Sequence, residues 1–173
     1  DQEVDIVGMT RSITKYGVTV RERKDLGRII KMGFQIAGSG KPGPVLIDIP
    51  KDIQTQAGSP DYPAYVDIRG YHPNETVHIG QLKKAYRLLK SAKRPLIIAG
   101  GGVHIAGAED KLQEFAEKMN IPVVTTIMGK GCMPVDSPMY VGNCGMHGRY
   151  AANRAVGECD VLFSIGTRFN ARI

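Results

Sequence analysis

The sequence predicts an α/β protein with parallel sheets flanked by helices. Amphipathic segments of helical period alternate with short apolar runs rich in β-branched residues, and several of these runs end in glycine. Strands that alternate with helices pair in parallel and are covered on both faces. Residues 55–77 show no periodicity and divide the chain. We therefore expect a Rossmann-like domain at 78–173, joined by a linker at 55–77 to the tail of a second α/β domain at 1–54.

In the first part, a helix is predicted over 24–40 because apolar residues recur there at helical spacing and the segment ends in Gly-Ser-Gly. Its predicted apolar positions are Leu26, Ile29, Ile30, Gly33, Phe34 and Ala37. The run Val45–Ile49, which Pro50 ends, predicts a buried strand. The stretch that follows contains three prolines and is typical of a linker.

In the second part, helices and strands alternate. The amphipathic segments predict helices at 79–92 and 106–120 and another after residue 148, and the apolar runs predict strands within 94–103, 121–131 and 159–169.

Composition argues against several classes of protein. The net charge is +6, but the basic residues are mixed with acidic ones, and only 6% of residues are aromatic with no Trp, which argues against a nucleic-acid partner. No apolar run is long enough to span a membrane, and no signal peptide is recognised, so we expect a cytoplasmic protein. Three cysteines without a C-x-x-C pair, and four histidines without ligand spacing, predict neither disulfides nor a metal site.

Glycine-bearing strand ends indicate where a ligand would bind, because ligands of parallel sheets collect at the carboxyl ends of the strands. Residues 100–102 are either part of a nucleotide site or glycines that turn the chain into a helix. Residues 125–131 offer hydroxyls and amides but also suit a capped turn, and Arg168 is either a diphosphate ligand or a surface residue. Taken together, three such ends in one sheet favour a binding edge.

The stretch CGMHGRYAANRAV at 144–156 places a small polar turn directly before a predicted helix, which favours a nucleotide-type cofactor. His147 within it has no second histidine at metal spacing, and a lone histidine is commonly structural. The sequence shows no nucleophile elbow and no paired carboxylates, so a complete catalytic constellation is not visible.

Five segments together resemble the large, catalytic subunits of acetolactate synthase (acetohydroxyacid synthase), in the thiamine-diphosphate-dependent enzyme family. They are QEVDIVGMTRSITKYGVTV, GSGKPGPVLIDIPKDIQ, TTIMGKG, GMHGRYAANRAV and ECDVLFSIGTRF, and they run along essentially the whole chain. The resemblance implies a fragment: the end of a pyrimidine-binding domain, a linker, and the first part of a central domain. The parent enzyme would use thiamine diphosphate and Mg²⁺, which this chain would not hold by itself because it has no G-D-G motif.

The resemblance further implies an FAD site in the central domain. The matching positions are Lys41, Gly101, Thr126, Ile127, Cys144, Gly145, Met146, His147, Gly166, Thr167, Arg168, Phe169 and Asn170. It also places four residues, Gln2, Lys51, Met146 and Arg172, along the approach of the 2-oxo acid substrates, pyruvate and 2-oxobutanoate. The chain departs from the family in two places: Lys41 stands where arginine is usual, and Asn170 and Ala171 stand where two acidic residues are usual.

The parent would serve branched-chain amino acid biosynthesis, form a homo-oligomer and take a small regulatory subunit. Two alternatives stay open. One is another thiamine-diphosphate carboligase or decarboxylase, such as a glyoxylate carboligase-like enzyme, and the other is a non-catalytic nucleotide-binding module.

Overall fold

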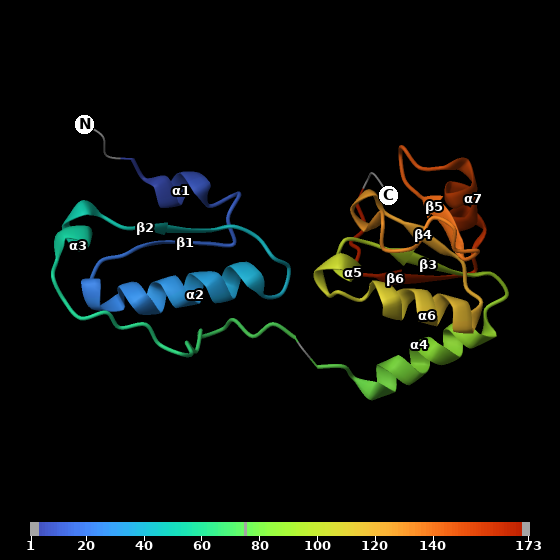
Figure 1. Cartoon of the computed structure of the whole chain (residues 1–173), viewed down its shortest axis with the longest axis horizontal. Helices are drawn as coiled ribbons and strands as arrows, with labels where there is room; N and C mark the ends of the chain where they lie inside the picture. The colour runs from blue at the N-terminus through green and yellow to red at the C-terminus, as the bar shows by residue number, and fades with distance from the viewer. Residues whose placement is uncertain (1–3, 75, 171–173) are drawn as a thin grey trace. The chain divides into compact units, whose positions relative to one another are not determined.

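The computed structural model describes residues 4–74 and 76–170. The chain divides into two compact units, Asp1–Thr76 and Val77–Ile173 (Figure 1). Both units are α/β with parallel strands, which confirms the predicted fold class.

The first unit is built on a β-α-β crossover. Its elements are α1 (Ile6–Thr10), β1 (Tyr16–Thr19), a 3₁₀ turn (Arg23–Asp25), α2 (Leu26–Gly38), β2 (Val45–Asp48) and α3 (Lys51–Thr55). Strands β1 and β2 pair in parallel, with Tyr16 opposite Val45 and Thr19 opposite Asp48. Helix α1 lies on one side of this strand pair and α2 on the other (Figure 1). Strand β2 is half-buried rather than buried, because the sheet of this unit has two strands in the described residues.

Helix α2 buries a stripe that differs slightly from the predicted one. Its buried residues are Ile29, Met32, Gly33 and Ile36, whereas Phe34 is 74% exposed. Leu26 and Ile29 pack with Val20, which directly follows β1. The buried stripe therefore repeats at three and four residues, as predicted. Phe34 lies on the face of the helix opposite this buried stripe. Its large apolar side chain therefore did not determine which face of α2 packs on the sheet.

The segment after α3 has no helix or strand, yet part of it packs on the first unit. Val66 is 5% exposed and lies against Met32 and Ile36 of α2. The Tyr71 hydroxyl lies 3.1 Å from Nζ of Lys15, and Lys15 donates a second hydrogen bond to the Ser39 carbonyl at 2.7 Å. This segment is therefore seated on α2 by a small apolar contact and by hydrogen bonds at the carboxyl end of the helix.

The second unit holds a four-stranded parallel sheet of order β5-β4-β3-β6. Its elements are α4 (Ile79–Ser91), β3 (Pro95–Ala99), α5 (Gly102–Ile105), α6 (Glu109–Met119), β4 (Val123–Thr125), a 3₁₀ turn (Ile127–Gly129), β5 (Tyr140–Asn143), α7 (Tyr150–Glu158) and β6 (Val161–Ile165). The predicted helices and strands of this part are all present. Strand β5 and the one-turn helix α5 were not predicted from the sequence.

The sheet of the second unit is covered on both faces. Ile97 of β3 packs with residues of α4 and α6 on one face, whereas Leu96 and Ile98 pack with α7 on the other. Figure 1 shows α4 and α6 on the opposite side of the sheet from α7. A strand buried on both faces needs apolar residues at successive positions, which explains the unbroken apolar run of β3. None of the helices among the described residues is long and apolar enough to cross a membrane.

Candidate functional site

The candidate site lies at the carboxyl ends of the strands in the second unit. The chain leaves β3 for β4 on one side, and later returns to add β6 on the other side of β3. The direction of winding therefore reverses between β3 and β6. In parallel sheets, ligands bind in the crevice beyond such a reversal.

Backbone-to-backbone contacts close the gap between the ends of β3 and β6. Gly102 donates its N–H to the Gly166 carbonyl at 2.8 Å, and Gly100 donates to Ile165 at 2.9 Å. A Cβ on Gly100 would lie 2.5 Å from the Gly166 oxygen, and Gly166 itself has φ +59. The glycines that follow β3 are thus required by packing. A Cβ on Gly101 would lie 3.2 Å from Met128, so this position is tight as well.

The end of β4 has a threonine hydroxyl that already makes a hydrogen bond within the turn, followed by exposed apolar side chains. Thr126 is 4% exposed, and its Oγ1 accepts the Gly129 N–H at 3.2 Å. Its own N–H donates to the Ala99 carbonyl at 2.9 Å. Ile127 and Met128 are 69% and 73% exposed. Thr126 therefore shapes this turn, while the two following side chains offer the contact surface.

His104 connects the helix after β3 to the loop after β4. Its Nδ1 lies 2.8 Å from Oε1 of Glu109, and its Nε2 lies 3.2 Å from the Lys130 carbonyl. Both partners are acceptors, so both ring nitrogens must carry protons to satisfy them together. The Glu109 carboxylate, and after it the Lys130 carbonyl, raise the pKa of His104 above its ordinary 6.5. The pKa of Glu109 is lowered, first by its own backbone N–H and then by His104.

This bridge predicts a stability that depends on pH. Because folding raises the pKa of His104, its contribution is present below the ordinary pKa and is lost as pH rises through the raised value. We expect the melting temperature of His104→Gln to fall below that of the unsubstituted chain at about pH 6 and to approach it by about pH 9. Thermal melts across this range, with Glu109→Gln and the double variant completing a cycle, measure the effect. If the difference in melting temperature between His104→Gln and the unsubstituted chain did not change with pH, an ionised His104–Glu109 bridge would be ruled out.

The turn Cys144–Gly148 joins β5 to α7 and carries the two exposed side chains of the GMHG motif. Cys144 is 7% exposed and packs in the core with Ile98, and burial raises the pKa of its thiol. Gly145 donates its N–H to Oδ1 of Asn153 at 2.8 Å. Met146 is 68% exposed, and His147 is exposed beside it. A ligand at this turn would meet Met146 and His147, whereas the Cys144 thiol faces the core.

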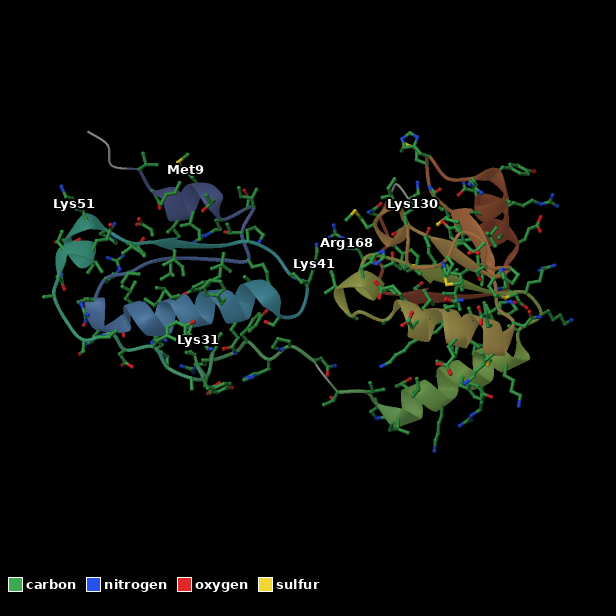
Figure 2. The ribbon with its side chains drawn as sticks, viewed as in Figure 1. Met9, Lys31, Lys41, Lys51, Lys130 and Arg168 are labelled. Atoms are coloured by element: carbon green, nitrogen blue, oxygen red, sulfur yellow. The ribbon has the colours of Figure 1, made fainter. Side chains whose placement is uncertain are left out.

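The end of β6 adds a cation and an aromatic ring. Arg168 is exposed, Phe169 is 65% exposed, and Thr167 is half-buried next to Gly100. Figure 2 shows Arg168 and Lys130 at the same end of the second unit. The sheet therefore gathers apolar side chains and positive charge at its carboxyl edge.

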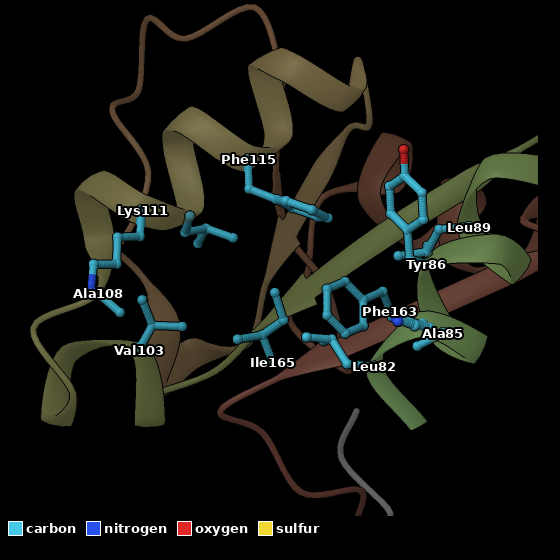
Figure 3. A pocket seen from close by; sticks show the side chains of 12 residues that line it. Leu82, Ala85, Tyr86, Leu89, Val103, Ala108, Lys111, Phe115, Phe163 and Ile165 are labelled. Atoms are coloured by element: carbon cyan, nitrogen blue, oxygen red, sulfur yellow. The ribbon is translucent and has the colours of Figure 1, made fainter. Parts of the chain in front are cut away.

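A hydrophobic groove lies elsewhere in the second unit, between α4 and α6. It has a volume of about 560 Å³, and Figure 3 shows Leu82 and Tyr86 of α4, Phe115 of α6 and Phe163 of β6 around it. The rings of Phe115 and Phe163 meet edge to face, with centroids 5.9 Å apart. The groove is lined by apolar groups and by two lysines, Lys83 and Lys111. This lining favours contact with another apolar surface over a catalytic site.

The sequence model of the thiamine pyrophosphate enzyme central domain matches residues 82–173, which include every strand of this sheet. The chain belongs to the thiamine pyrophosphate enzyme family. Two curated relatives match 99% of the chain. The protein of Methanocaldococcus jannaschii named "Probable acetolactate synthase large subunit" is 47% identical, and the acetolactate synthase isozyme 3 large subunit of Escherichia coli is 41% identical. The chain spans about 30% of the length of each relative.

A solved structure supports the same fold. The X-ray structure of a Mycobacterium smegmatis protein, described as a thiamin diphosphate-dependent enzyme, matches with a TM-score of 0.77. The match covers 98% of this chain and 32% of that one, at 24% identity. It therefore extends over both units of this member of the thiamine pyrophosphate enzyme family.

The side chains of this family member bear on which cofactors it could hold. Among residues 4–74 and 76–170, no three His, Cys, Asp or Glu side chains are grouped so that they could hold a metal ion. At the strand ends, the exposed apolar side chains are of a kind that could contact an apolar ring system, and the exposed cation is of a kind that could pair with a diphosphate. Ile127, Met146, Phe169 and Arg168 have that chemistry.

The remaining predicted residues lie outside this edge. Lys41 is exposed in the loop between α2 and β2, and Lys51 is exposed at the first position of α3, so both belong to the first unit. Gln2 and Arg172 lie outside the described residues. Asn153 and His104 were not predicted as site residues. For Asn153, the available signal was an Asn at the fourth position of the helix after GMHG. No sequence signal marked His104.

Proposed function

We propose that this chain is a section of the large subunit of an acetolactate synthase, an enzyme that decarboxylates pyruvate and joins the two-carbon unit to a second 2-oxo acid, pyruvate or 2-oxobutanoate. The observation that carries the proposal is the match of 99% of the chain, across both units, to proteins named as acetolactate synthase large subunits at 41–47% identity. The reaction would serve branched-chain amino acid biosynthesis in the cytoplasm.

Within that subunit, this chain would hold FAD at the carboxyl edge of the second sheet. The contacts would come from Gly101, Thr126, Ile127, the turn 144–147 and residues 166–170. Exposed Ile127 and Phe169 would cover apolar parts of the flavin, and Arg168 would pair with its diphosphate. The close backbone packing of Gly100 and Gly102 against Gly166 supports a rigid floor for such a ligand.

Thiamine diphosphate and Mg²⁺ would be held outside this chain, and the thiamine would supply the electron sink for decarboxylation. Four residues of this chain, Gln2, Lys51, Met146 and Arg172, would line the approach of the oxo acids. Arg172 would pair with the carboxylate of the second oxo acid, and exposed Met146 would give that approach an apolar wall. Homo-oligomerisation and a small regulatory subunit complete the proposal.

The test is the product of the full-length subunit that contains this chain. With pyruvate, thiamine diphosphate, Mg²⁺ and FAD, we expect 2-acetolactate, detected as acetoin after acid decarboxylation. Heat-denatured subunit is the matched control. Formation of tartronate semialdehyde from glyoxylate, with no acetolactate from pyruvate, would instead assign a glyoxylate carboligase-like enzyme.

A further inference from the structure

The turn between β5 and α7 is closed by backbone hydrogen bonds and contains a glycine in a left-handed conformation. Gly145 has φ +106, which favours glycine, and its carbonyl accepts the Gly148 N–H at 2.9 Å. Arg149 donates its N–H to the Asn143 carbonyl at 2.8 Å, which closes the base of the turn. A Cβ on Gly148 would lie 2.6 Å from the Cys144 carbonyl carbon, so the two strands of the turn are in backbone contact.

One side chain outside the turn clamps it from α7. Oδ1 of Asn153 accepts the Gly145 N–H at 2.8 Å, and Nδ2 of Asn153 donates to the Gly145 carbonyl at 3.0 Å. The carboxamide thus pairs with both polar groups of Gly145, as a neighbouring strand would. Asn153 is itself fixed in the helix by its N–H, which donates to the Arg149 carbonyl at 3.0 Å. Asn153 therefore links the turn to α7.

The clamp lies next to two exposed side chains, those of Met146 and His147. Cys144 is anchored at 7% exposure on one side, and Gly148 is packed against backbone on the other. Met146, 68% exposed, and exposed His147 lie between these anchors. Their positions follow from the conformation of Gly145, which Asn153 holds.

We infer that Asn153 is a positioning residue for the ligand edge: through Gly145 it holds Met146 and His147 in the arrangement that the bound nucleotide requires. The inference rests on the proposed flavin site. Asn153 is exposed, so water can replace its two hydrogen bonds when it is removed and the fold loses little. The ligand loses more, because it must then order the turn on binding.

The test compares three variants of the full-length subunit. Asn153→Ala removes both hydrogen bonds, and Asn153→Asp keeps the acceptor but sets a carboxylate against the Gly145 carbonyl. Arg154→Ala is the matched control, because Arg154 is exposed on the same helix and forms an ion pair with Glu158 at 2.6 Å. We expect FAD, titrated by flavin fluorescence, to bind about tenfold more weakly to Asn153→Ala, and to bind Asn153→Asp more weakly than it binds the unsubstituted subunit. The control should bind as the unsubstituted subunit does.

Two further measurements separate positioning from general stability and from the flavin proposal. Melting temperatures without FAD should be nearly unchanged in Asn153→Ala, whereas amide hydrogen exchange at 145–148 should become faster than in the control. Unchanged affinity and exchange would overturn the inference, and so would a loss of affinity that a matching loss of thermal stability explains. If the unsubstituted subunit binds no FAD, the flavin proposal fails, and unchanged exchange in Asn153→Ala would overturn the clamp separately.

Discussion

Replacing Gly166 by alanine is expected to destabilise the second unit by about 3 kcal/mol or more. Gly166 has φ +59, and an added Cβ would lie 2.6 Å from the backbone nitrogen of Val103 and 2.8 Å from Gly102. Neither neighbour is a flexible side chain that could move aside. The ends of β3 and β6 would have to separate, which would break the Gly102 to Gly166 hydrogen bond of 2.8 Å.

Gly107→Ala is the matched control for this prediction. Gly107 has nearly the same backbone angle, φ +56, but apart from its chain neighbours no atom of the described residues lies within 4 Å of its added Cβ. Gly107→Ala should therefore be destabilised only by the cost of the left-handed conformation, about 1 kcal/mol. Urea denaturation, with hydrogen exchange of the β3 amides to report on the second unit, measures both variants. Equal losses would show that backbone strain alone, and not the contact between strand ends, requires glycine at 166.

A second expected result concerns the segment that packs on α2. A Cβ on Gly27 would lie 1.7 Å from the Asp61 carbonyl oxygen. We expect Gly27→Ala to displace the segment around Asp61 and to destabilise the first unit by about 1–3 kcal/mol, against the gain in helix propensity. Limited proteolysis should then cut more readily within 56–74.

Gly38, at the other end of α2, provides the opposite case. Outside its own turn of helix, no atom in the part of the chain that the structure describes lies within 4 Å of its added Cβ, so Gly38→Ala should stabilise the helix by about 0.5 kcal/mol. The two substitutions are chemically identical and lie on one helix, but they should change stability with opposite signs. Equal effects, or unchanged proteolysis of Gly27→Ala, would contradict the packing of the segment on α2.

Local periodicity was enough to predict most elements of this chain. The apolar run of β3 and the amphipathic patterns of α4 and α6 are strong signals, because each element buries a face that its own residues define. Strand β5 was missed because its four residues, YVGN, include a glycine and only one β-branched residue. Its pairing with β4 holds it in the sheet, and that contact is not local in sequence.

The candidate edge was predicted in outline, but the roles of its residues were not. From the sequence, the glycines after β3 were either part of a ligand site or a turn into the next helix, and the structure shows that Gly100 and Gly102 are needed for contact with Gly166. Cys144 matched a family position, yet its thiol is buried. Whether a side chain faces the core or the edge depends on the turn that carries it.

The sequence by itself determined the α/β class, the alternation of elements and the family, since these depend on periodic burial and on motifs contiguous in the chain. Only the tertiary structure revealed that Asn153 clamps Gly145, that His104 bridges Glu109 and Lys130, and that Asp61 lies against Gly27. These contacts join residues whose partners are chosen by the direction and register of packed elements. Local propensity does not encode such directions, because the same side chain can face core, solvent or a neighbouring loop.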